Sequence, residues 1–136
     1  LRSGLADGTI DAVCSEHTTL DEDVKRMPFG ESEPGATGVE LLLPLTLKWA
    51  MEAAVPLAQA LAAVTSRPAS IMQVDAGAIS AGAAADLCVF DPDAHVRITP
   101  ESLRSQGKNT PFLGYELPGR VRYTLVAGQV VHESAG

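Results

Sequence analysis

The stretch from residue 10 to residue 17 constrains the fold more than any other part of the sequence. A short, mostly apolar run over residues 10–14 ends in Ser15, Glu16 and His17, and a long polar loop follows. Apolar runs of this length are typical of parallel strands buried on both faces, and barrels of strands and helices carry reactive groups at the carboxyl ends of such strands. The pattern therefore predicts a barrel strand through Ser15 with a site at its rim.

Helical spacing dominates the chain between residues 39 and 72. Apolar residues recur every three or four positions over residues 39–53, and Pro44 stands early enough to mark where that helix begins. A second helix is expected from Pro56 to about residue 65, and a short third helix over residues 67–72. Single helical turns are expected before them, one stopped by Gly8 and one at residues 21–25.

The pattern changes at Gly77 from helical spacing to short β runs separated by turns. This change predicts two parts, residues 1–76 and residues 77–136. Ala127 and Gly128 join the last two predicted strands as a two-residue hairpin. Strands are expected at residues 85–90, 95–98, 119–126 and 129–132, with a turn at residues 91–93 closing the first.

The charge of the chain narrows the class of partner. A formal net charge of -7 argues against nucleic acid and anionic membranes, which favour basic surfaces, and no apolar run reaches the roughly 20 residues of a membrane helix. Cys14 and Cys88 each lie in an apolar run, so we expect two buried, reduced thiols in a cytoplasmic protein rather than a disulfide or a metal pair. The start at Leu1 without a methionine leads us to expect a fragment.

Several short motifs, in the same order along the chain, resemble the C-terminal third of the dihydroorotases. The resemblance covers nearly the whole chain. A weaker motif over residues 77–92, with two glycines, alanine-aspartate, a strand and aspartate-proline, is similar to the wider amidohydrolase superfamily, including hydantoinases and allantoinases. The dihydroorotase motifs are residues 7–11, the strand end at residues 15–17, Lys25, and residues 28–31, 34–40 and 107–114.

The resemblance implies an α/β fold: a barrel of strands and helices beside a small β-sandwich. Residues 1–76 would hold the last barrel strand and the helices after it, and residues 77–136 the C-terminal part of the sandwich. The missing N-terminal part of its own chain would supply the other strands. Dihydroorotases close N-carbamoyl-aspartate to dihydroorotate, or hydrolyse the ring, at a zinc site on the barrel rim. The resemblance also implies an oligomer for the full-length protein.

This sequence departs from the dihydroorotase pattern at two positions that carry chemistry. Glu16 stands where the family has an aspartate that binds zinc and handles the proton of the attacking water, while the adjoining histidine is kept as His17. Leu20 replaces a second histidine, which holds the substrate carboxylate. Pro34 and Gly35 match the place where active relatives offer backbone groups to the pyrimidine ring.

The two departures have different physical costs. A glutamate reaches one methylene further than an aspartate, so Glu16 would overshoot a zinc–oxygen distance of about 2.0–2.2 Å unless the backbone or rotamer adjusted. Leu20 has no hydrogen-bond donor, so the substrate carboxylate would lose a charge-assisted interaction of roughly 1.5–3 kcal/mol at this position. Lys25 or Arg26 could replace that donor, although basic residues in an acidic loop are ordinarily solvated.

Two functions remain open from the sequence. The first is a non-catalytic, dihydroorotase-like subunit that supports the assembly of aspartate carbamoyltransferase. The second is an active zinc-dependent dihydroorotase, or a related amidohydrolase that uses Glu16 as ligand and base on a cyclic amide other than dihydroorotate. His95 and His132 fall in predicted sandwich strands, so we expect this fragment alone to bind no zinc and to be inactive. We also expect it to fold poorly, because a barrel strand without its neighbours leaves both backbone edges unpaired.

The remaining motifs have simpler explanations. Residues 107–110, Gly-Lys-Asn-Thr, superficially look like a phosphate loop but lack its full spacing and a following helix. Trp49 has helical spacing with Leu42 and Leu45, which favours a place in the core.

Overall fold

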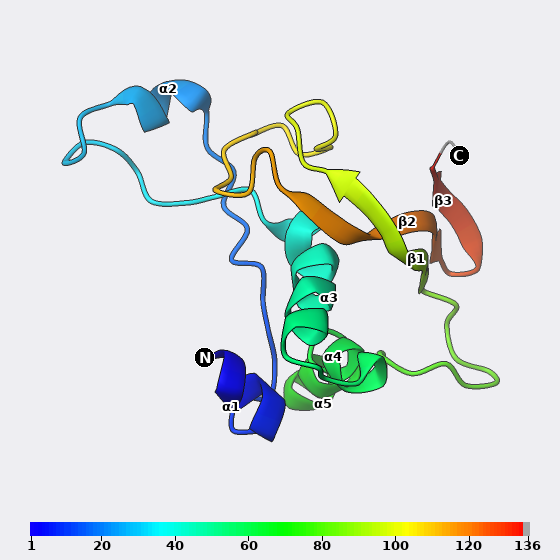
Figure 1. The fold of residues 1–136 in the computed structure, drawn as a ribbon. Coiled ribbons are helices and arrows are strands. Elements are labelled where there is room, and N and C mark those ends of the chain that lie inside the picture. Colours follow the sequence, from blue (N-terminus) through cyan, green and yellow to red (C-terminus); the bar gives the residue numbers. More distant parts are fainter. Residues whose placement is uncertain (135–136) are drawn as a thin grey trace.

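The structure is a computed structural model that describes residues 1–134. Figure 1 shows α4 and α5 gathered near one end of α3, while the sheet crosses the other end. The elements in chain order are α1 (Arg2–Asp7), α2 (Glu22–Arg26), the 3-10 helix η1 (Val39–Leu41), α3 (Leu42–Glu52), α4 (Leu57–Ala62), α5 (Ser66–Met72), β1 (Leu87–Arg97), β2 (Glu116–Val126) and β3 (Gln129–Glu133).

The helices form close to where the apolar spacing predicts them. Gly8 ends α1 in the left-handed conformation, with φ 84°. The helix α3 begins two residues before Pro44, which is tolerated there because the first turn has no intrahelical N–H bond to lose. The helix α4 ends at Ala62, three residues earlier than predicted, and α5 follows at Ser66.

The sheet is antiparallel, in the order β1-β2-β3. The predicted hairpin between β2 and β3 is confirmed: Ala127 and Gly128 both have positive φ, as a type I′ turn requires. The two strands predicted on either side of residues 91–93 are instead one strand, β1, with a register break between Asp91 and His95.

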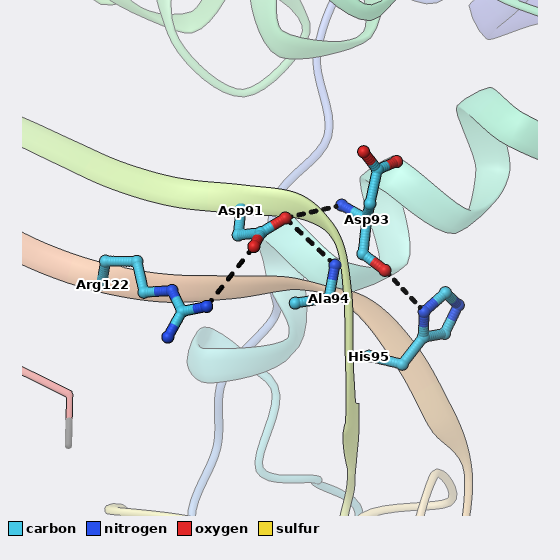
Figure 2. A network of polar contacts seen from close by, with 5 residues as sticks. All are labelled: Asp91, Asp93, Ala94, His95 and Arg122. Atoms are coloured by element: carbon cyan, nitrogen blue, oxygen red, sulfur yellow. Dashed lines mark hydrogen bonds and ion pairs between the residues drawn. The ribbon is translucent and has the colours of Figure 1, made fainter. Parts of the chain in front are cut away.

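The break in β1 is built around the Asp91 carboxylate, as Figure 2 shows. It accepts hydrogen bonds from the N–H groups of Asp93 (3.1 Å) and Ala94 (3.2 Å), and Arg122 lies 3.4 Å away on β2. These N–H groups, with the Arg122 guanidinium, lower the pKa of Asp91. The side chain thus satisfies the N–H donors of Asp93 and Ala94, which the register break leaves outside the ladder, while Pro92 has no N–H to satisfy.

The helix α3 connects two hydrophobic clusters. Its start and the sheet share the first cluster, and its end packs on α1 and α4 in the second. Gly119 of β2 lies so close to α3 that a Cβ there would meet Leu47 Cδ1 at 2.4 Å. The first cluster consists of Leu41, Ile98, Leu103 and Leu117 with Leu45 and Phe112, and the second of Trp49, Ala50 and Ala60 with Leu5, Ala6 and Val55.

Two predictions need correction, one on a strand and one on the burial of the cysteines. Residues 10–15 form no strand, because a strand requires hydrogen-bonded neighbours and the Val13 N–H donates to the Ala63 carbonyl instead. Cys14 and Cys88 are free as expected, but both are exposed rather than buried. Trp49 lies in the core as predicted. Among the residues described, no helix has the length and apolar character to cross a membrane.

Candidate functional site

The predicted rim residues lie at the base of the long loop over residues 18–37. The two ends of this loop meet in an isolated parallel bridge between His17 and Ala36, with the Thr18 N–H 3.0 Å from the Ala36 carbonyl oxygen. Glu16, just before the bridge, is exposed and has φ 47°, which is uncommon for a non-glycine residue. Such conformations persist where surrounding contacts fix the backbone, and here the bridge provides them.

The His17 side chain closes the base of the loop from the other side. Its Nδ1 accepts hydrogen bonds from the N–H groups of Gly38 (3.1 Å) and Val39 (3.2 Å), at the start of η1. An imidazole nitrogen that accepts has no proton, so a neutral His17 carries its hydrogen on Nε2. His17 therefore acts here as a cap for the η1–α3 helical segment, and its Nδ1 is not available to a metal.

The turn at Pro34 and Gly35 is held by residues 107–110, which we call the strap segment. The Asn109 side-chain Nδ2 donates to the Gly35 carbonyl at 2.9 Å. The Asn109 carbonyl accepts from the Thr37 N–H at 2.7 Å, and the Thr37 hydroxyl donates to the Gly107 carbonyl at 2.5 Å. Sequence reasoning discarded this segment as a phosphate loop; the structure brings it to the predicted rim.

Leu20 lies beside this turn. A Cβ added at Gly35 would meet Leu20 Cδ1 at 3.1 Å, and one added at Gly107 would meet the Leu20 carbonyl oxygen at 2.9 Å. Leu20 also lines a cavity of about 440 Å³ with Lys25, Asn109 and other residues of the loop and the strap segment. The position that the resemblance assigns to a carboxylate-holding histidine therefore presents a hydrocarbon surface.

The two basic residues that could replace that histidine are engaged elsewhere. The Lys25 ammonium donates to the Glu33 carbonyl, and Arg26 pairs with Glu22 at 3.0 Å within α2. Lys108, the strap segment's own cation, donates to the carbonyls of Leu103 and Ser105, both at 2.7 Å. These contacts hold the three cationic side chains in place, so each could reach a ligand carboxylate only through N–H donors that the contacts leave over or after a change of rotamer.

Glu40 ties η1 to the turn that precedes the strap segment, a role that sequence reasoning missed. Its carboxylate accepts from the Arg104 N–H (2.6 Å), the Ser105 N–H (2.7 Å) and the Ser105 hydroxyl (2.6 Å). Partial burial raises the pKa of Glu40, but these hydrogen bonds and the Lys108 charge outweigh burial and hold the pKa below its usual value. Glu40 and Asn109 both lie in motifs of the dihydroorotase resemblance, at residues 34–40 and 107–114. That membership is the signal in the sequence that could have pointed to their roles.

The described residues do not by themselves fit a zinc site. No group of three histidine, cysteine, aspartate or glutamate side chains with metal-binding geometry occurs within residues 1–134. Glu16 is the carboxylate at the rim, and Nδ1 of the neighbouring His17 is already used. His95 and His132 lie in β1 and β3, as predicted. Any zinc at Glu16 would therefore need ligands from outside the residues described.

Comparison with known sequences places the chain in a family. Residues 46–132 match the model of the amidohydrolase family. A dihydroorotase-like protein of Pseudomonas putida is 45% identical over 97% of this chain, and one of Pseudomonas aeruginosa is 42% identical over 98%. A dihydroorotase of Geobacter sp. (strain M21) is 39% identical over 98%. The chain spans about a third of the length of these relatives, 31%, 31% and 32% respectively.

Solved structures agree with the sequence relatives. The L-hydantoinase (dihydropyrimidinase) of Arthrobacter aurescens superposes with a TM-score of 0.86 at 27% identity, over 97% of this chain and 31% of that one. The dihydropyrimidinase of Brevibacillus agri gives 0.89 at 22% identity, over 97% and 30%, and shows likeness of fold. The predicted fold class, a segment of an α/β amidohydrolase, is confirmed. The chain belongs to the amidohydrolase family, with dihydroorotases and dihydroorotase-like proteins among its relatives.

Proposed function

We propose that this chain is part of a cytoplasmic, dihydroorotase-like protein of pyrimidine biosynthesis that does not turn over dihydroorotate. The observation that carries the proposal is Leu20: its side chain lies beside Gly35, and the nearby cations Lys25 and Arg26 are bound elsewhere. A carboxylate placed against Leu20 would lose water without gaining a charged donor from that side chain, which costs roughly 1.5–3 kcal/mol for the missing hydrogen bond.

The rim nevertheless keeps an element suited to an uncharged ring. Within residues 1–134 the Gly35 N–H has no hydrogen-bond partner, whereas the Gly35 carbonyl is taken by Asn109. A free backbone donor next to an apolar side chain suits a ring carbonyl flanked by carbon atoms. The proposal is therefore a protein that can bind a pyrimidine-type ring at this turn but has lost groups required for turnover.

We assign to the full-length protein a supporting role in the assembly of aspartate carbamoyltransferase. The assignment rests on the resemblance of the strand end, Ser15 to Thr18 followed by Leu20, to dihydroorotase-like subunits that have lost site residues. In the test, the full-length protein is mixed with the purified catalytic chain of aspartate carbamoyltransferase, and sedimentation velocity measures the complex. A stable complex is expected, and two independently sedimenting species at micromolar concentration would defeat the assignment.

A second candidate is an active, zinc-dependent cyclic amidohydrolase. It is favoured by the Geobacter relative, which is a dihydroorotase at 39% identity, and by the L-hydantoinase likeness at 27%. In this reading Glu16 is both metal ligand and base, with the other ligands outside this chain. The upstream sequence separates the two readings: a His-x-His at the end of the first barrel strand, with a lysine further along, favours the enzyme, and their loss favours the non-catalytic protein.

A further inference from the structure

One residue of the strap segment holds both sides of the rim turn. Asn109 donates from its side chain to the Gly35 carbonyl at 2.9 Å and accepts at its own carbonyl from the Thr37 N–H at 2.7 Å. It therefore contacts two loop residues that flank Ala36, although it stands 74 positions after Gly35 in the chain. The Thr37 hydroxyl, on a side chain that is 1% exposed, binds Gly107 of the same segment.

The hydrogen bond to Gly35 controls more than one atom. The Gly35 carbonyl and the Ala36 N–H belong to one planar peptide group, so fixing the carbonyl fixes the direction of that amide. Gly35 itself has φ +149°, a conformation that residues with side chains rarely adopt, and as a glycine it has wide rotational freedom on its own side of the plane. Without the Asn109 donor, that freedom would let the peptide plane rotate to present its carbonyl to water.

We propose that Asn109 is a positioning residue for the rim turn: by holding the peptide plane between Gly35 and Ala36, it fixes the backbone rotation at Gly35 and thereby the direction in which the preceding peptide presents the Gly35 N–H to a ring ligand. The proposal rests on the proposed function, since it takes the turn as the ring-binding element. It adds the strap segment to the site without requiring Asn109 to touch the ligand.

The test uses the full-length protein and calorimetric binding of 5,6-dihydrouracil, a neutral ring, and of dihydroorotate. Asn109→Asp keeps the shape of the side chain but replaces its donor with an acceptor that faces the Gly35 carbonyl. Gln129→Glu places the same added charge at an exposed position in β3, away from the loop and the strap segment, and serves as its control. Thr37→Val removes the hydroxyl bond to Gly107 at nearly constant volume, and Thr37→Ser restores it.

We expect Asn109→Asp and Thr37→Val to weaken dihydrouracil binding by about tenfold, which corresponds to about 1.4 kcal/mol. Thr37→Ser and Gln129→Glu should bind dihydrouracil like the parent. When the four variants are ranked by melting temperature, the ranking should differ from their ranking by affinity. Unchanged affinity in Asn109→Asp, or affinities that simply follow melting temperature, would overturn the proposal. If Asn109→Asp does not fold, the Thr37 pair decides the matter by the same comparison.

The two levels of inference fail in different ways. A parent protein that binds neither dihydrouracil nor dihydroorotate overturns the ring-binding part of the proposed function, and the positioning role with it. A parent that binds dihydrouracil while Asn109→Asp binds it equally well overturns the positioning role alone.

Discussion

Replacing Gly38 with alanine tests whether the rim segment is seated against the start of η1 as described. Gly38 has a negative φ, −141°, so positive-φ strain is not at issue. A Cβ at this position would lie 2.6 Å from the Ser15 carbonyl oxygen, a backbone atom that cannot swing away. The added methyl group must push residues 15–17 and 38–39 apart, which also stretches the two hydrogen bonds to His17 Nδ1.

The magnitude follows from these contacts. Overpacking of this kind costs about 1–3 kcal/mol, and each weakened hydrogen bond up to about 1 kcal/mol, so Gly38→Ala should lower the free energy of unfolding by about 2–4 kcal/mol. Urea denaturation of the full-length protein measures the change. Gly30→Ala is the matched control, because a Cβ at Gly30 meets nothing within 4 Å. Equal unfolding free energies for the two variants would refute the seating of Ser15 on Gly38.

Three further predictions concern the rest of the chain. Gly119→Ala should lower the free energy of unfolding by about 2–4 kcal/mol in urea denaturation, because the new methyl group clashes with Leu47 and the residue keeps a strained positive φ. Gly82→Ala has the positive-φ strain without a clash, so it should lower the free energy of unfolding by about 1–2 kcal/mol. Folding lowers the pKa of Glu40, so the stability that this carboxylate contributes is present above the ordinary glutamate pKa and is lost as the pH falls through the pKa of the folded state. Glu40→Gln should therefore show a smaller fall in melting temperature than the parent over the acid range. Residues 1–136 expressed alone should show no cooperative thermal melt by circular dichroism, and a cooperative monomeric melt would contradict this.

The helices and the hairpin could be predicted because local signals determine them. The apolar spacing of α3, Gly8 after α1 and the Ala127-Gly128 turn each act within a few residues, and each appears in the structure. The stretch over residues 10–15 was predicted as a strand and is not one, because strand formation depends on neighbours that the sequence of the stretch does not contain.

The site was predictable in part. The resemblance pointed to Glu16, Leu20 and Gly35, and the structure gathers them at one loop base, but their proposed roles stay predictions. The contacts of Asn109 could not be predicted from spacing, because a side chain hydrogen-bonding across 74 residues leaves no local pattern. The break in β1 was expected as a turn because Pro92 ordinarily interrupts a strand, whereas the Asp91 carboxylate bridges the gap.

The most direct test of the account is the rate of dihydroorotate ring opening by the full-length protein with added zinc, with Glu16→Ala as the blank. The replacement of the family aspartate by Glu16 and the loss of the carboxylate-binding group at Leu20 together predict a rate no greater than that of the blank. Ring opening at ordinary enzyme rates of about 1–1,000 per second, abolished by Glu16→Ala, would contradict the account and identify Glu16 as a working residue of an active amidohydrolase.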